Sequence, residues 1–270
     1  MKRILYLANI FLFSLSVSAQ MPEIESLLNL AKTYQEQKEY LKAIECHESI
    51  IELIKPFDNN NITNIVRGTI AINYINLGSP LLKAEKFAEA KPYFDRALEY
   101  ASDDPKVLPR ANSWMGEWYS SYALKIRSNK TNLQQAVDYS VIAEKYFNLA
   151  GEHNKALKEI ICRSSVLADL SQTNEAITLL QSVIDECERV SDKTQILTKA
   201  LYELGTIELS SENYQSAILH LERCYTLSLE SNHQTASLAA QRLLRLYESQ
   251  IPDSSKADLW RKRVAEFNIP

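Results

Sequence analysis

The four histidines and four cysteines of this 270-residue chain are the side chains best suited to metal binding or nucleophilic chemistry. Cys46 and His47 are neighbours, but successive residues of a helix point about 100° apart, so the two cannot easily share one ion. His220 and Cys224 are four residues apart and share a helix face. A zinc site needs three or four ligands, however. We therefore interpret His47 as a packed histidine and expect no metal site.

Other motifs of catalysis are missing from the sequence. It contains no HExxH, CxxC or GxSxG pattern, and its carboxylates are scattered along predicted helices near lysines and arginines. Its five glycines lie far apart, whereas a phosphate-binding loop needs two or three clustered ones. The net charge of -4 gives no electrostatic case for nucleic-acid binding. We expect a protein that is not an enzyme, uses no cofactor and binds no nucleic acid.

All four cysteines, Cys46, Cys162, Cys187 and Cys224, fall within helical patterns and have no regular spacing. We interpret them as small buried apolar residues. Cys162 and Cys187 lie on the two helices of one predicted hairpin, but the mirror position of Cys162 across the turn is near residue 184. A disulfide between them would need distortion. The redox state of the four thiols is left open by the sequence.

Residues 1–19 have the features of a signal peptide. Lys2 and Arg3 are followed by an apolar stretch over 4–17, and Val17 and Ala19 are the small residues at the -3 and -1 positions. The stretch is shorter than the roughly 20 residues of a membrane span, and no later segment approaches one. We expect cleavage after Ala19 and export, with residues 20–270 in the periplasm or outside the cell. A membrane anchor or a buried first helix is the alternative.

An alanine that is followed four residues later by a predicted core residue recurs along the chain. The copies are Ala43 and His47, Ala90 and Phe94, Ala136 and Ser140, Ala176 and Leu180, Ala217 and Leu221, and a weaker Ala257 and Arg261. Upstream of five of them lies a pattern with positions i, i+3, i+4 and i+7 on one helix face. Its i+4 residue is small: Ala31, Gly78, Ala123, Ser164 or Gly205. Each unit is therefore predicted to consist of helix A, a short turn and helix B, with the small residues where the two helices approach most closely. One hairpin cannot bury its apolar face alone, so such units stack in arrays.

This pattern resembles tetratricopeptide repeats, over nearly all of residues 20–270 and in about six units. The spacing of about 40 residues or more exceeds the 34 of the standard repeat, and the proline that closes each unit is mostly missing. The long repeat is similar to that of exported bacterial members of the family. The resemblance implies an all-α fold: a right-handed α-α superhelix, or solenoid, forming one domain over 20–270.

Three further features bear on the boundaries of the helices. Residues 56–64 and 102–109 are rich in Asn, Asp and Pro and are predicted to be the longer joins between units. Pro80 is expected to kink or shorten helix A of the second unit.

Residues 254–268 are predicted to be a C-terminal capping helix, started by a capping box of Ser255 and Asp258. Its apolar stripe consists of Ala257, Trp260, Val264 and Phe267, with Arg261, Lys262 and Arg263 facing mostly outward. A docking helix is the alternative.

The resemblance also implies a concave groove lined by the A helices. The candidate groove residues are Asn29, Lys32, Asn76, Lys158, Lys199, Tyr202, Arg242 and Arg245. Asn29 and Asn76 take equivalent positions, and an amide can both donate to and accept from a peptide backbone. The lysines and arginines of the C-terminal half form a basic stripe that could receive a carboxylate. The alternative is that all of these are ordinary polar residues on a wet surface.

By this resemblance the chain is expected to be a non-catalytic scaffold or adaptor in the bacterial cell envelope. It would bind an extended peptide or a partner helix, so the partner is a protein or peptide. An exported sensor that acts through a separate membrane signalling partner is the alternative function. The sequence leaves the oligomeric state open.

Overall fold

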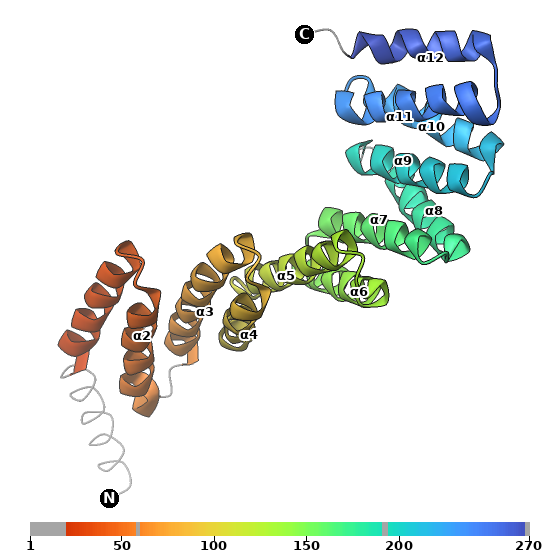
Figure 1. Ribbon diagram of the computed structural model, residues 1–270. Helices are drawn as coiled ribbons and strands as arrows, with labels where there is room; N and C mark the ends of the chain where they lie inside the picture. Colours follow the sequence, from red (N-terminus) through yellow and green to blue (C-terminus); the bar gives the residue numbers. More distant parts are fainter. Residues whose placement is uncertain (1–19, 58–59, 191–193, 268–270) are drawn as a thin grey trace, which may run out of the picture. The chain divides into compact units, whose positions relative to one another are not determined.

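The computed structural model describes residues 20–57, 60–190 and 194–267, and within these ranges it contains helices but no strand (Figure 1). The predicted signal peptide, 1–19, lies outside the described residues. The helices are one over residues 20–36, α2 (Tyr40–Ile54), η1 (Lys55–Phe57), α3 (Asn60–Lys83), α4 (Phe87–Ala101), α5 (Leu108–Ser128), α6 (Leu133–Leu149), α7 (His153–Asp169), α8 (Thr173–Arg189), α9 (Thr194–Ser210), α10 (Tyr214–Ser228), α11 (His233–Arg245), η2 (Leu246–Gln250) and α12 (Ser254–Glu266). The predicted all-α class is confirmed.

The chain divides into two compact units. Unit 1 comprises Met1–Trp118 with Leu149–Gly151, and unit 2 comprises Tyr119–Asn148 with Glu152–Pro270. The division falls within helix α5, so its first part belongs to unit 1 and its last part to unit 2. The assignment of 20–270 as one domain stays a prediction.

Neighbouring helices pack in pairs within each unit. In unit 1, α2 packs on α3 and α3 on α4. In unit 2, every helix from α7 to α11 contacts the next, and α7 also contacts α9 while α9 contacts α11. Contacts between alternate helices are typical of stacked hairpins, in which each A helix touches the A helix of the next unit. The predicted helical-hairpin array is thus confirmed within the units.

The repeated alanines lie at the centres of these contacts. All five, Ala43, Ala90, Ala136, Ala176 and Ala217, are completely buried. The residues four positions later, His47, Phe94, Ser140, Leu180 and Leu221, are buried too. On the facing helix, Gly78 of α3 lies so near Phe94 of α4 that a Cβ there would come within 2.9 Å of the ring. The spacing in the sequence therefore marks the positions where helix A and helix B approach most closely.

Five of the turns between helix A and helix B share one backbone feature. Each of the five contains one residue other than glycine with a φ between 50° and 63°. These residues are Lys38, Glu85, Lys130, Ser171 and Glu212. Since the left-handed region costs an L-amino acid about 1–2 kcal/mol, the packing of the hairpins has to hold this conformation.

Pro80 does not shorten its helix, so that part of the prediction is wrong. Helix α3 continues through Pro80 to Lys83, and the backbone N–H of Ala84 donates to the carbonyl oxygen of Pro80 at 3.0 Å. The proline is exposed, so its ring is directed toward solvent, and only one hydrogen bond is lost.

Both predicted joins are shorter than expected. Helix α3 begins at Asn60, inside the predicted join 56–64. Helix α5 begins at Leu108, inside the predicted join 102–109, and places Pro109 in its first turn. A proline there costs little, because the first N–H groups of a helix have no partner within the helix.

The N-cap of α12 also differs from the prediction. Asp253, not Ser255, occupies the N-cap position, and its side chain accepts a hydrogen bond from the Lys256 N–H at 3.1 Å. Asp258, the other member of the predicted capping box, instead pairs with Arg261 on the exposed face.

The apolar stripe of α12 faces the rest of unit 2. Ala257 and Trp260 are buried, and the Trp260 ring meets Tyr225 of α10 edge to face at 5.1 Å between centroids. Arg261 and Lys262 are exposed as predicted, while Arg263 is half-buried, with its guanidinium 4.6 Å from the Trp260 ring centre. These contacts support a covering role, while the choice between capping and docking stays a prediction.

Candidate partner-binding groove

The candidate site lies in unit 2 and is lined mainly by α7, α9 and α11. Figure 1 shows α7 in green, α9 in teal and α11 in blue, and the contacts of α9 with α7 and with α11 place it between them. Three neighbouring cavities follow this face.

The largest of the three cavities has a volume of about 590 Å³ and lies between α7, α9 and the start of α11. Three of the predicted groove residues, Lys158, Lys199 and Tyr202, line it. The other lining residues are Glu159, Ile161, Cys162, Glu203, Asn232, Gln234, Thr235 and Leu238. The structure thus brings together residues that are up to 80 positions apart, from Lys158 to Leu238.

A second cavity of about 380 Å³ contains the other two predicted cations, Arg242 and Arg245. The Nε of Arg242 donates to the Tyr202 hydroxyl at 3.4 Å, which joins this cavity to the first. A third cavity, of about 310 Å³, shares Glu203 with the first and Thr206 with the second. We refer to the residues that line the three cavities as the α7–α9–α11 groove.

The four predicted cations of the groove lack ion-pair partners within the part of the chain that the structure describes: no Asp or Glu there lies within ion-pair distance of Lys158, Lys199, Arg242 or Arg245. Lys158, Lys199 and Arg245 are exposed, and Arg242 is half-buried. Arg223, in contrast, pairs with Glu188 at 2.6 Å. The groove cations therefore remain able to bind an anionic group.

Four carboxylates, those of Glu159, Asp169, Glu203 and Glu248, also line the groove, so the predicted basic stripe is mixed in charge. Glu203 accepts a hydrogen bond from Ser165 Oγ at 2.9 Å. Glu159 is buried and accepts one from Ser120 Oγ at 2.5 Å. Sequence reasoning missed Glu159. It occupies the position that Ala200 takes 41 residues later, and this exchange of a small residue for a charged one was the available signal.

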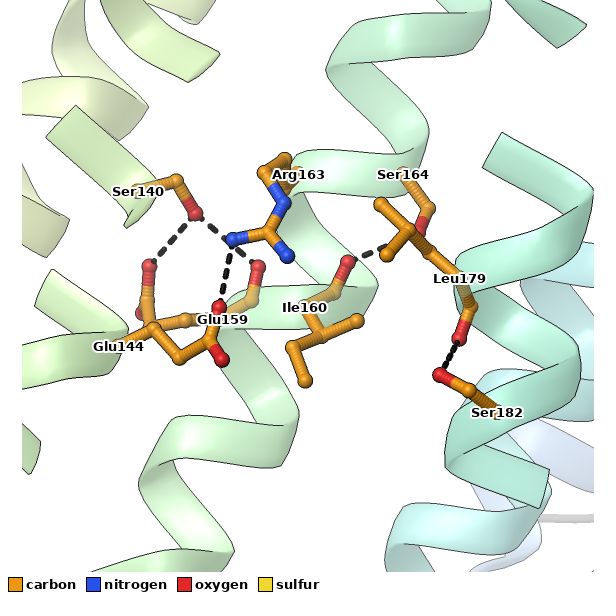
Figure 2. A network of polar contacts seen from close by, with 8 residues as sticks. All are labelled: Ser140, Glu144, Glu159, Ile160, Arg163, Ser164, Leu179 and Ser182. Carbon is orange, nitrogen blue, oxygen red and sulfur yellow. Dashed lines mark hydrogen bonds and ion pairs between the residues drawn. The ribbon is translucent and has the colours of Figure 1, made fainter. Parts of the chain in front are cut away.

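Glu159 belongs to a network of polar contacts between α6 and α7, which Figure 2 shows from close by. Ser140 Oγ lies 3.0 Å from the backbone oxygen of Glu159 and 3.2 Å from its Oε2. One turn away, Arg163 Nη1 forms an ion pair of 2.6 Å with Glu144 Oε2. Because buried charges need hydrogen-bonding partners to offset their desolvation, this network fixes α6 against α7 in one register.

The three predicted residues of the N-terminal half lie in unit 1. Asn29 and Lys32 are exposed on the helix over residues 20–36, and Asn76 is half-buried on α3. A hydrogen bond between these two helices comes from a different pair, with Gln35 Nε2 donating to Asn73 Oδ1 at 2.9 Å. That Asn29 and Asn76 clamp a peptide backbone stays a prediction.

The cysteines differ in burial, which corrects part of the prediction. Cys46, Cys187 and Cys224 are buried as expected, but Cys162 is exposed and lines the α7–α9–α11 groove. All four thiols are free in the structure. Burial raises the pKa of Cys224 to about 11, so that this thiol stays protonated at neutral pH.

The histidines singled out in the sequence have structural partners. His47 is buried, and its Nδ1 lies 2.5 Å from the Ala43 carbonyl oxygen, which confirms the packed histidine. His220 Nδ1 lies 2.7 Å from the buried carboxylate of Glu208. Cys224 Sγ lies 3.2 Å from the Thr198 carbonyl oxygen, to which the thiol donates. Within the described residues, no cluster of three His, Cys, Asp or Glu side chains could hold a metal ion.

Among the described residues, no helix combines the length and the apolar character that crossing a bilayer requires.

Comparisons with known proteins point to one family. A family model described as the tetratricopeptide repeat matches residues 24–55 and 71–104. Among solved structures, the chain is similar to BtubC from P. vanneervenii, with 17% identity, a TM-score of 0.57, and coverage of 83% of this chain and 89% of that one. It is also similar to a Rap protein complexed with competence and sporulation factor, with 15% identity, a TM-score of 0.52, and coverage of 91% and 76%. No curated protein matches the sequence.

Proposed function

Because this chain is a tetratricopeptide-repeat protein, we propose that it is a non-catalytic interaction scaffold that holds an extended peptide or a partner helix. The observation that carries the proposal is the α7–α9–α11 groove. It is continuous over three cavities and lined by four cations that lack ion-pair partners within the described residues.

The chemistry of the groove favours a partner segment that carries carboxylates. Ammonium and guanidinium groups form charge-assisted hydrogen bonds with carboxylates, and these are stronger than neutral ones. Tyr202 and Leu238 add an aromatic and an aliphatic surface in the same cavity as Lys158 and Lys199. A groove already formed in the free protein lowers the ordering cost of binding. The similar Rap protein was solved with competence and sporulation factor bound, and we propose an analogous binding role for this chain.

We further propose that the protein acts in the bacterial cell envelope, in the periplasm, after export directed by residues 1–19. The support is the basic start, the apolar stretch and the small residues before Gln20. Intact-mass measurement of the chain recovered from the cell envelope tests this. A mature chain that begins at Gln20 is expected, and an unprocessed chain in the cytoplasm would contradict it.

The scaffold role is tested by crosslinking and affinity capture from native cell envelopes, with the purified full-length chain as bait. The first variant, Lys158→Ala/Lys199→Ala/Arg245→Ala, removes three exposed groove cations. The matched control, Lys130→Ala/Lys145→Ala/Lys262→Ala, removes the same charge from exposed positions of unit 2 outside the groove.

A partner captured by the original chain and by the control variant, but lost with the groove variant, is the expected result. Equal capture by all three proteins would place binding outside the groove. Equal loss with both variants would reveal a nonspecific charge effect and would contradict the proposal as well.

A sensor of a small ligand is the second candidate function. The cavity of about 590 Å³ favours it, because small-molecule sites typically measure about 300–1,000 Å³. The chain would then signal through a separate membrane partner. Thermal-shift screening against small carboxylate ligands tests this, since binding to the folded state raises Tm. A ligand whose effect disappears in the groove variant would favour the sensor over the adaptor.

A further inference from the structure

The hairpin of α5 and α6 is packed differently from its neighbours. In two other hairpins a glycine of helix A faces a large side chain of helix B: Gly78 faces Phe94, and Gly205 faces Leu221. The corresponding residues of α5 and α6 are Ala123 and Ser140. Both of these side chains are short, so the position that Phe94 and Leu221 fill elsewhere is left partly empty.

A small pocket occupies this place. It has a volume of about 70 Å³ and is lined by Ser120, Ala123, Leu124, Arg127, Ala136, Ser140, Glu159, Cys162 and Val166. One water needs roughly 10–15 Å³, and an engineered cavity of about 150 Å³ binds benzene. The pocket therefore has room for about three or four carbon atoms, which is the size of a branched aliphatic side chain.

The walls of the pocket favour an apolar occupant. The carbon surface comes mainly from Ala123, Leu124, Ala136 and Val166. Glu159 is buried at its edge, where the hydroxyls of Ser120 and Ser140 hydrogen-bond its carboxylate. These bonds hold the carboxylate in the wall, so that the open volume is bounded mostly by carbon.

The pocket adjoins the α7–α9–α11 groove. Glu159 and Cys162 line both the pocket and the largest groove cavity, and Arg127 lines both the pocket and the third cavity. A peptide in the groove can therefore direct one side chain into the pocket while its neighbouring residues stay near Lys158 and Lys199.

We propose that the pocket between α5, α6 and α7 binds a valine or leucine side chain of a peptide held in the α7–α9–α11 groove, with an acidic residue of the same peptide at Lys158 and Lys199. This specificity rests on the proposed scaffold function. The aliphatic side chain is selected by the volume and the carbon walls, and the acidic residue by the two lysines that lack ion-pair partners within the described residues.

Filling the pocket tests the proposal. Ser140→Leu introduces the side chain that Leu180 and Leu221 provide at the equivalent position of their hairpins. Ser140→Ala is the matched control, because it removes the same hydroxyl but leaves the pocket open. Ala123→Val fills the pocket from the opposite helix and replaces Ser140→Leu as the test if that variant does not fold. Circular dichroism and Tm show whether each variant is folded.

The probe is a phage-displayed library of random linear peptides, selected on the purified full-length chain. Enriched peptides are expected to share a valine or leucine near an acidic residue. By fluorescence polarisation, Ser140→Leu and Ala123→Val should weaken the strongest peptide by at least about tenfold, because burial of several CH₂ groups is lost. Ser140→Ala should change affinity by less than about threefold.

The outcomes separate the two proposals. If the groove variant Lys158→Ala/Lys199→Ala/Arg245→Ala loses binding but the filling variants do not, the pocket inference is overturned and the scaffold function stands. Equal weakening by Ser140→Ala and Ser140→Leu would also overturn the pocket inference, because the hydroxyl rather than the volume would then matter. If no peptide is enriched, or neither set of variants affects binding, the proposed groove function fails, and the pocket inference fails with it.

Discussion

Gly205 of α9 lies directly against Leu221 of α10. A Cβ at position 205 would come within 2.7 Å of Leu221 Cγ and 3.3 Å of the Ala217 carbonyl oxygen. Leu221 is completely buried and cannot move aside into solvent. The closest approach of this hairpin thus depends on the missing side chain, as the small-residue pattern of the sequence suggests.

Gly205→Ala is therefore expected to destabilise the protein by about 1–2 kcal/mol. Overpacking costs about 1–3 kcal/mol, and the better helix propensity of alanine offsets up to about 1 kcal/mol of that. Urea unfolding followed by circular dichroism measures the change. The double variant Gly205→Ala/Leu221→Ala relieves the contact, so the penalty for Gly205→Ala should vanish in that background. An unchanged or higher stability of the single variant would show that the helices separate freely here.

Glu212→Gly is expected to stabilise the protein by about 0.5–1 kcal/mol. Glu212 has a φ of 58° in the turn between α9 and α10, a conformation that glycine adopts without the steric cost borne by other residues. The entropy that glycine gains in the unfolded state reduces this benefit. Glu222→Gly is the control. Glu222 is an exposed residue in the middle of α10, so this substitution should destabilise the protein by about 1 kcal/mol. Chemical denaturation of both variants checks the opposite signs.

Removing one member of the Arg163–Glu144 ion pair is expected to be costly. Their side chains are only 11% and 25% exposed, and the atoms lie 2.6 Å apart. Glu144→Ala would leave the Arg163 guanidinium without this carboxylate and should cost roughly 1.5–3 kcal/mol. Replacing both residues, as Glu144→Leu/Arg163→Met, should recover most of the loss because no charge remains buried. A double-mutant cycle measures the coupling energy between Glu144 and Arg163. Stability losses that simply add in the double variant would show that the two side chains are not coupled.

His47 should make the stability fall in weak acid. Burial lowers the pKa of His47 below its ordinary value of 6.5, so the unfolded chain binds a proton more readily than the folded one. Its contribution is complete above about pH 6.5 and is lost as the pH falls from there toward the lower pKa of the folded state.

The variant His47→Phe places at this position the residue type that Phe94 provides in the next hairpin. The decrease of Tm between pH 7.5 and pH 5.5 should be smaller for this variant than for the original chain. The control, His233→Gln, removes an imidazole from an exposed position. An identical pH dependence of His47→Phe and the original chain would refute the role of His47.

The sequence alone determined the hairpin architecture, for a physical reason that is local. A helix repeats every 3.6 residues, so small residues at fixed spacing mark the face where two helices meet. Ala90 and Ala217, together with Gly78 and Gly205, lie at these contacts as predicted. The sequence also brought Lys158, Lys199 and Tyr202 to attention, because equivalent positions of successive A helices share a face.

The tertiary structure decided features that the spacing of residues along the chain does not specify. The charge of the groove depends in part on Glu159 and Glu203, whose positions follow from the packing of α7 on α9. The cap of α12 is Asp253 because its own backbone is extended and the helix already begins at Ser254, one residue before the predicted box. The pocket beside Ser140 exists because two short side chains from different helices meet at one point. Spacing along a chain predicts which residues share a face, but only the folded packing fixes which faces meet and what space remains between them.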